Sequence, residues 1–284
     1  MGTLTQQPFP ELKRVVLSSG SQTSPILPDN FLGGFTPRLR VLILDKITFP
    51  GLPKLLLSAN GLVKLVLKEI STGGYFSSDA MANCLSGMSK LKYLVIEFQS
   101  RTSHPASKNR RSSSLTRTIL PAFTVFQFQG TSEYLEDLVA RIHAPLLNRL
   151  SVRFFDEPPF DIPQLSQFIY LTEKIKIRDY LSLDISLPNC ECSLDVSSPD
   201  EDVNGWFSLT VPSLPMDRHL SCITQICDQL SLDSHLQALR IYGNWRPFWQ
   251  DIPEWLDFFR LFPTVCSLTV WTEMWPLSLL FKKS

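Results

Sequence analysis

The sequence predicts an α/β repeat fold, in which short parallel strands line one inner sheet and helices return on the convex side. The main observation is a phrase of three apolar residues, with the second three places and the third five places after the first. Its copies begin about 23 to 34 residues apart, near the period of a leucine-rich repeat. A second observation is the helical spacing of apolar residues between several copies. Together they predict a single leucine-rich-repeat-like solenoid over residues 1–284.

The phrase has a direct structural meaning. Its last two apolar residues are two apart, so both side chains face one side of a short strand, and the first residue turns the chain into that strand. One such strand cannot bury its apolar side alone, whereas a stack of them forms a continuous core. The clear copies are Leu39/Leu42/Leu44, Leu62/Leu65/Leu67, Leu91/Leu94/Ile96, Phe123/Phe126/Phe128, Leu147/Leu150/Val152, Leu236/Leu239/Ile241 and Val265/Leu268/Val270. Looser copies are Leu12/Val15/Leu17, Trp206/Leu209/Val211 and Thr172/Ile175/Ile177.

Helical segments between the copies set the strand direction, because a strand–helix–strand order requires parallel strands. A short return is expected at 54–59, after a Pro-Gly-Leu-Pro break. Stronger helices are expected where a capping residue precedes apolar residues at three- and four-residue spacing. These helices are predicted to begin at Ser77 or Ser78, Thr131 or Ser132, Asp161, Asp217 and Asp251.

Three features depart from this rhythm. Residues 100–118 carry five basic residues, many serines and no acid, which predicts a disordered basic insertion. Residues 180–187 and 192–196 alternate in polarity, which predicts a hairpin or a pair of irregular strands. No polar-faced element covers the first or the last phrase, so we expect the array to be truncated at both ends.

Composition restricts the classes of function. Lys plus Arg equals Asp plus Glu at 27 each, so we expect no nucleic-acid partner and no membrane partner. No apolar run reaches the ~20 residues that span a bilayer, and residues 1–10 do not have the pattern of a signal peptide. The six cysteines are scattered through apolar segments, which indicates reduced thiols. A monomer located in the cytoplasm or the nucleus is therefore expected.

No catalytic signature is present, and we expect neither catalytic residues nor a cofactor. The four histidines lie apart in sequence and are more typical of solvated or capping residues than of bases. Cys190 and Cys192 could bind one zinc ion, but a second pair is missing, because Cys222 and Cys227 point to different sides of a helix. Structural thiols explain them better, so no metal site is predicted. An enzyme whose site leaves no motif is the less favoured alternative.

The concave face of the solenoid is the better candidate site, because residues that flank the last two apolar positions of each phrase project there. The early copies give an apolar stripe of Val16, Val41, Ile43, Val66 and Val95. We expect this stripe to pack on a missing segment, since large apolar patches are usually covered. The later copies are basic with aromatics, which favours a partner surface. The predicted partner-binding residues are Lys64, Lys68, Arg149, Arg153, Arg178, Arg240, Tyr242 and Trp271. Ordinary surface variation is the competing explanation.

Several blocks of sequence carry a family resemblance. The most specific is SEYLEDLVARI at 132–142, continued by APLL at 144–147, and others lie at 27–59, 74–85 and 120–123. Over about residues 27–270, and less clearly between 175 and 215, the chain resembles the F-box/leucine-rich-repeat-like proteins of mushroom-forming fungi. The resemblance implies a repeat region that recognises substrates for a ubiquitin ligase, behind an F-box that docks on a Skp-type adaptor.

The F-box itself is not expected within this chain, because nothing before Leu12 could form its helices. A Skp-type adaptor is therefore an expected partner only if an F-box precedes the chain. A free-standing binding module without a ubiquitin role is the alternative.

Overall fold

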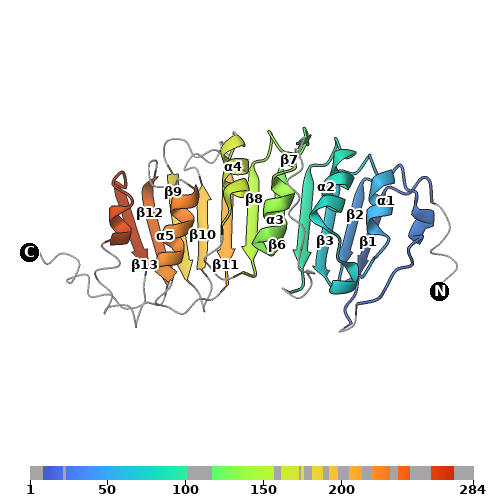
Figure 1. Ribbon diagram of the computed structural model, residues 1–284, viewed down its shortest axis with the longest axis horizontal. Helices are drawn as coiled ribbons and strands as arrows, with labels where there is room; N and C mark the ends of the chain where they lie inside the picture. The colour runs from blue at the N-terminus through green and yellow to red at the C-terminus, as the bar shows by residue number, and fades with distance from the viewer. Residues whose placement is uncertain are drawn as a thin grey trace, which may run out of the picture. The chain divides into compact units, whose positions relative to one another are not determined.

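The computed structural model describes residues 9–21, 24–100, 117–156, 161–172, 174–175, 181–187, 192–197, 205–212, 219–230, 236–243 and 257–271. The chain forms two compact units. Unit 1 comprises Met1–Asp156 and Phe160–Lys176, and unit 2 comprises Glu157–Pro159 and Ile177–Ser284. Both units contain strands and helices, and the protein is a mixed α/β protein with mostly parallel strands (Figure 1).

Six strands of unit 1 form a parallel sheet in the order β1-β2-β3-β4-β6-β8. They are β1 (Arg14–Ser18), β2 (Val41–Asp45), β3 (Lys64–Ile70), β4 (Tyr93–Phe98), β6 (Val125–Gly130) and β8 (Arg149–Phe154). The helices between them are α1 (Leu52–Ser58), α2 (Ser78–Ser86), α3 (Ser132–Val139) and α4 (Pro163–Leu171), with short 3-10 turns η2 (Phe31–Gly34) and η3 (Thr72–Gly74). Two short strands, β5 (Thr118–Ile119) and β7 (Ile142–His143), pair separately in parallel.

The phrase residues of unit 1 lie side by side across the sheet. Leu42 pairs in register with Leu65, Leu65 with Leu94, Leu94 with Phe126 and Phe126 with Leu150. All five side chains are fully buried. The prediction of parallel strands that share one continuous apolar core is therefore confirmed for this unit.

The backbone repeats with the phrase. In every clear copy of unit 1, the N–H of the first phrase residue closes a turn by donating to the carbonyl three residues earlier, as Leu39 does to Thr36. The residue after it accepts two N–H groups from the next copy, as Arg40 accepts those of Val63 and Lys64. In the loose copy expected to begin at Thr172, the Thr172 N–H donates to Ile169 at the end of α4, and a second such turn follows, in which the Ile175 N–H donates to Thr172.

The side chains that cap two of the helices differ from those predicted. Ser77 caps α2 as expected, with its Oγ accepting the Ala80 N–H at 3.1 Å. Asp161, in contrast, does not cap α4, which begins two residues later. The carboxylate of Glu136, on α3, accepts the Gln164 and Leu165 N–H groups at 2.8 and 2.7 Å instead. The cap of α4 therefore comes from the preceding helix.

The start of α3 has a similar arrangement. Thr131, at its N-cap position, makes no side-chain capping bond. The carboxylate of Asp156, just after β8, accepts the Ser132 N–H at 2.5 Å and the Ser132 hydroxyl at 2.9 Å. A neighbouring segment again supplies the acceptor that the first turn requires.

Unit 2 contains β9 (Leu181–Leu187), β10 (Cys192–Ser197), β11 (Trp206–Val211), α5 (His219–Leu230), β12 (Leu236–Gly243) and β13 (Ser267–Trp271). Their order is β11-β10-β9-β12-β13. The predicted hairpin is confirmed, because β9 and β10 pair antiparallel. The copy at 206–211 was expected to lie in a parallel array, but β11 pairs antiparallel with β10. β12 is parallel to both β9 and β13.

Other expectations fall partly outside the described residues. Residues 101–116 of the expected insertion at 100–118 lie outside them, whereas Thr118 belongs to β5 and Arg117 bonds to Ala140 and Gln167. Of the helix expected to begin at Asp251, residues 257–260 are described and helical. No helix within the described part of the chain is long and apolar enough to cross a membrane.

Candidate interaction surface

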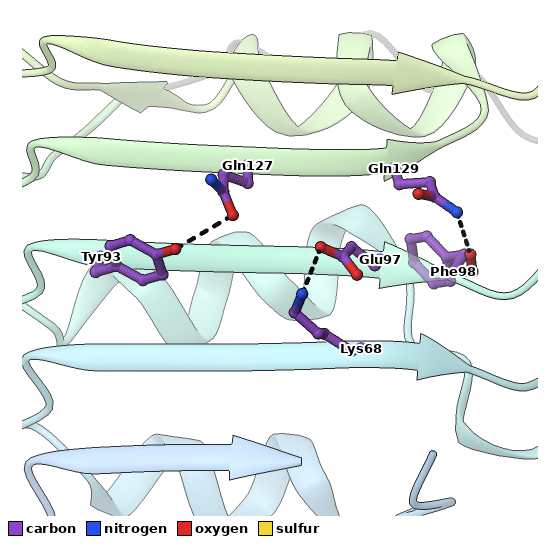
Figure 2. Close-up of polar contacts among 6 residues, drawn as sticks. All are labelled: Lys68, Tyr93, Glu97, Phe98, Gln127 and Gln129. Carbon is purple, nitrogen blue, oxygen red and sulfur yellow. Dashed lines mark hydrogen bonds and ion pairs between the residues drawn. The ribbon is translucent and has the colours of Figure 1, made fainter. Parts of the chain in front are cut away.

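The helices of unit 1 cover one face of its sheet and leave the other open. Figure 1 shows the helices of unit 1 on one side of its strands, and in Figure 2 the side chains of Lys68, Tyr93, Glu97 and Gln127 project from the side opposite the helices. We call this the open face and define it by the strand residues that alternate with the buried phrase residues. It comprises Arg14, Val41, Lys64, Tyr93, Val125 and Arg149, then Val16, Ile43, Val66, Val95, Gln127 and Ser151, then Ser18, Asp45, Lys68, Glu97, Gln129 and Arg153.

The apolar stripe expected on this face is largely covered by its own neighbours. Val66 and Val95 are only 5% and 1% exposed, although no described helix covers this side of the sheet. Val41 and Ile43 are half-buried, and Val16, at the end of the stripe, is 48% exposed. The expectation that the whole stripe packs on a missing segment is therefore corrected: only its β1 end is widely exposed.

Polar side chains connect the strands of the open face. The Lys64 Nζ lies 4.4 Å from the centre of the Tyr93 ring, a favourable cation–π distance. The Tyr93 hydroxyl donates to Gln127 Oε1 at 3.2 Å (Figure 2). The three residues connect β3, β4 and β6 across the open face.

A second polar bridge crosses the other ends of the same strands. Lys68 Nζ forms an ion pair with Glu97 Oε1 at 3.3 Å, and the Gln129 amide donates to the Phe98 carbonyl at 3.5 Å (Figure 2). The Lys68 side chain is 42% exposed, so this pair contributes little to stability. Lys64 and Lys68, both predicted to bind a partner, already have partners within the sheet.

The other two predicted residues of unit 1 are more accessible. Arg149 begins β8 and Arg153 lies four residues further along it, and both side chains are exposed. Arg149 pairs in register with Val125 and Arg153 with Gln129, so both project from the open face. The structure therefore brings four of the eight predicted residues onto one face of one sheet.

The predicted residues of unit 2 have a different charge environment. Arg240 pairs in register with Asp184 of β9, and Asp184 pairs with Asp195 of β10. The later part of the array was expected to be basic, but the hairpin places one acid, Asp184, next to Arg240 in register and a second, Asp195, one strand further away. Tyr242 pairs with Trp271, which is 64% exposed.

Arg178, the eighth predicted residue, lies outside the described residues.

The described titratable groups do not form a metal site: no three His, Cys, Asp or Glu side chains among them lie close enough to hold an ion. Burial raises the pKa of the Cys84 thiol to about 11 and that of Cys222 to about 12. Burial likewise raises the pKa of Glu136, which its two backbone hydrogen bonds oppose. Cys84 and Glu136 lie on the helices of unit 1 and not on its open face, and Cys222 is buried on α5 of unit 2.

Further basic residues lie just before the strands and were missed by the sequence prediction. Lys13, Arg40 and Lys92 each follow the first residue of a phrase and are exposed. Their shared position within the repeat is the signal that could have found them. The prediction considered only residues that alternate within the strand.

The comparisons with known proteins add no relative. No family model matches the chain, and no curated protein or solved structure matches it either.

Proposed function

We propose that the chain is a protein–protein interaction scaffold, a leucine-rich-repeat-like solenoid that binds its partner through the open face. The observation that carries the proposal is the open face itself. Six strands lie parallel and in register, their apolar sides packed under helices, and their other sides project rows of polar and charged residues. An array of this kind offers a broad, rigid surface whose residues vary from strand to strand, as repeat proteins use for binding.

The repeated turn and double acceptor at the start of each strand support the solenoid assignment. Each copy repeats the same backbone contacts with the next, for example Lys13 with Arg40 and Val41, then Arg40 with Val63 and Lys64. The sheet can therefore be extended copy by copy without a change of geometry. The helices would then lie on the convex side.

The cellular role proposed is substrate recognition for an F-box-type ubiquitin-ligase adaptor. Its support is the resemblance of the blocks at 27–59, 74–85, 120–123 and 132–147 to F-box/leucine-rich-repeat-like proteins. The Skp-type adaptor would be a partner of an F-box upstream of this chain.

Charge reversal on the open face tests the scaffold. Affinity capture from extracts of the native organism would compare the wild-type protein with an Arg149→Glu/Arg153→Glu variant and a variant that adds Arg240→Glu. Both changes should abolish capture of the proteins retained by the wild type, while circular dichroism stays unchanged. The control is a Lys54→Glu variant, because Lys54 is an exposed residue of α1. Unchanged capture by the Arg149→Glu/Arg153→Glu variant, which alters the open face alone, would refute the proposal.

Co-purification tests the ubiquitin role separately. The full-length protein should co-purify with a Skp-type adaptor if that role is right. Partner capture by an intact protein that retains no such adaptor would instead support a free-standing binding module.

A further inference from the structure

The amino-terminal edge of the unit 1 sheet is strongly basic. It is formed by six segments that contain the turn and the first strand residue of each copy: 9–14, 36–41, 59–64, 88–93, 120–125 and 144–149. Within these segments the acidic residues number one, Glu11, and it pairs with Arg38. We call their basic residues the basic rim: Lys13, Arg14, Arg38, Arg40, Lys64, Lys90, Lys92 and Arg149.

The opposite edge of the sheet is mixed in charge. Asp45, Glu69 and Glu97 lie there beside Lys46 and Lys68. The whole chain is neutral, with 27 basic and 27 acidic residues, so the rim is a local separation of charge. Such a separation produces a directed positive potential, which attracts anionic partners and speeds their association.

The helix dipoles explain only part of this rim. The carboxyl ends of α1, α2 and α3 come just before these turns, and cations stabilise helix carboxyl ends. However, none of the three helices has a basic residue in its last turn, and the effect decays within that turn. The basic residues instead lie beyond the helices, and most of them are exposed.

The backbone holds these residues at a regular spacing. The carbonyls of Lys13, Arg40 and Lys92 each accept two N–H groups from the following copy. Neighbouring strands lie about 4.8 Å apart, so β1 to β4 spread their rim residues over roughly 14 Å. An extended peptide rises about 3.3 Å per residue, so a run of about five residues spans this distance.

From this edge, and resting on the proposed scaffold function, we infer that unit 1 binds an extended acidic segment of a protein partner along the basic rim from β1 to β4. The positive charge of the rim favours acidic residues in the bound segment. Apolar contacts are offered beside it by the exposed Val16 and by the half-buried Val41 and Ile43. A protein segment fits better than single-stranded nucleic acid, which requires aromatic rings for base stacking. Of the aromatic residues in the rim segments, Phe123 is buried, Lys64 already covers the Tyr93 ring, and Phe9 is exposed at the end of the rim, where one ring cannot stack a run of bases.

The test measures binding of a defined probe. The probe is a fluorescein-labelled decapeptide of alternating Glu and Val, titrated with the full chain at 50 and 200 mM salt and followed by fluorescence anisotropy. The rim variant carries Arg14→Glu, Arg40→Glu and Lys92→Glu. The matched control carries Lys46→Glu, Lys54→Glu and Arg260→Glu, which change the net charge equally at described positions that do not belong to the rim segments.

The rim variant should lose at least tenfold in affinity and the control less than threefold, and added salt should weaken wild-type binding. The inference is overturned if the peptide does not bind, or if both variants lose affinity equally. It is also overturned if a labelled ten-nucleotide oligo-dT binds more tightly than the peptide and loses affinity in the rim variant, because the rim would then be a nucleic-acid surface.

Capture of the native partner separates this inference from the proposed function. If the rim variant captures that partner normally but Arg153→Glu, an open-face change outside the rim, does not, the scaffold function is supported and the acidic-segment inference is refuted. If neither variant affects capture, both the scaffold function and the acidic-segment inference are refuted.

Discussion

Replacing Gly51 by alanine tests how tightly the segment before η2 packs on α1. Gly51 is the N-cap of α1, with φ −76° and ψ 2°, a conformation open to any residue. Glycine is required there for space, because a Cβ would contact the backbone of Asp29, at 2.8 Å from its Cα and 2.9 Å from its carbonyl carbon, and closer still to its carbonyl oxygen.

The expected cost follows from these distances. Ordinary contact begins at 3.4 Å, so the two backbone segments would have to separate by about 0.6 Å at the Asp29 Cα and by more at its carbonyl oxygen. Overpacking of this kind costs about 1–3 kcal/mol, and the reduced freedom of the unfolded chain returns about 0.4–1 kcal/mol. Gly51→Ala should therefore lower the free energy of unfolding of unit 1 by about 1–2 kcal/mol.

Gly20 provides the matched control, since a Cβ there would have no atom within 4 Å. Gly20→Ala should be neutral or stabilise by up to about 1 kcal/mol. Urea denaturation followed by circular dichroism would give both values, provided that the m-value is unchanged. Two variants with equal stability would refute the close-approach argument.

Three further predictions concern the core, a thiol and a helix start. Leu94→Ala should cost about 3–5 kcal/mol, because Leu94 is fully buried between two other phrase residues, whereas Val16→Ala should cost less than about 1 kcal/mol by the same urea assay. Cys84 in the folded protein should resist alkylation at pH 8 and react once urea unfolds it, as read by mass spectrometry, because its pKa lies at about 11. The stability that its raised pKa confers is full below pH 9 and is lost as the pH rises towards 11, so replacement by serine should flatten the stability profile in that window. Asp156→Ala should cost about 1–2 kcal/mol and Asp156→Asn less, because the amide keeps one acceptor for Ser132; equal losses would contradict the capping role.

The strands of unit 1 could be predicted because their pattern is local. The phrase places its second and third residues on one side of a strand, and the helical segments between copies require parallel neighbours. Leu42, Leu65, Leu94 and Leu150 accordingly share one buried row. The same phrase at 206–211 could not reveal its antiparallel neighbour, since three apolar residues have the same spacing in either direction. The short link between β10 and β11 was the available signal of antiparallel pairing, because a crossover between parallel strands needs a dozen residues or more.

Interactions between copies were beyond sequence prediction because they depend on register. Glu136 lies 28 residues before Gln164 in the chain. Nothing in the sequence around either residue indicates that the Glu136 side chain caps α4, the helix that contains Gln164. The open face has the same difficulty. Its residues were predicted correctly for unit 1, but the contact of Lys64 with Tyr93 and the pairing of Lys68 with Glu97 depend on which residues become neighbours across strands.

The carboxylates that begin α3 and α4 have a consequence for how such an array can be rebuilt. Asp156 caps α3, which precedes it in the chain, whereas Glu136 caps α4, which follows it in the chain. A splice between α3 and β8, or between α3 and α4, therefore removes an acceptor from a helix on the far side of the cut. Duplicating or transplanting one strand–helix module would leave amide groups unsatisfied, so shuffled versions of this protein should remain intact only when several consecutive modules move as one block.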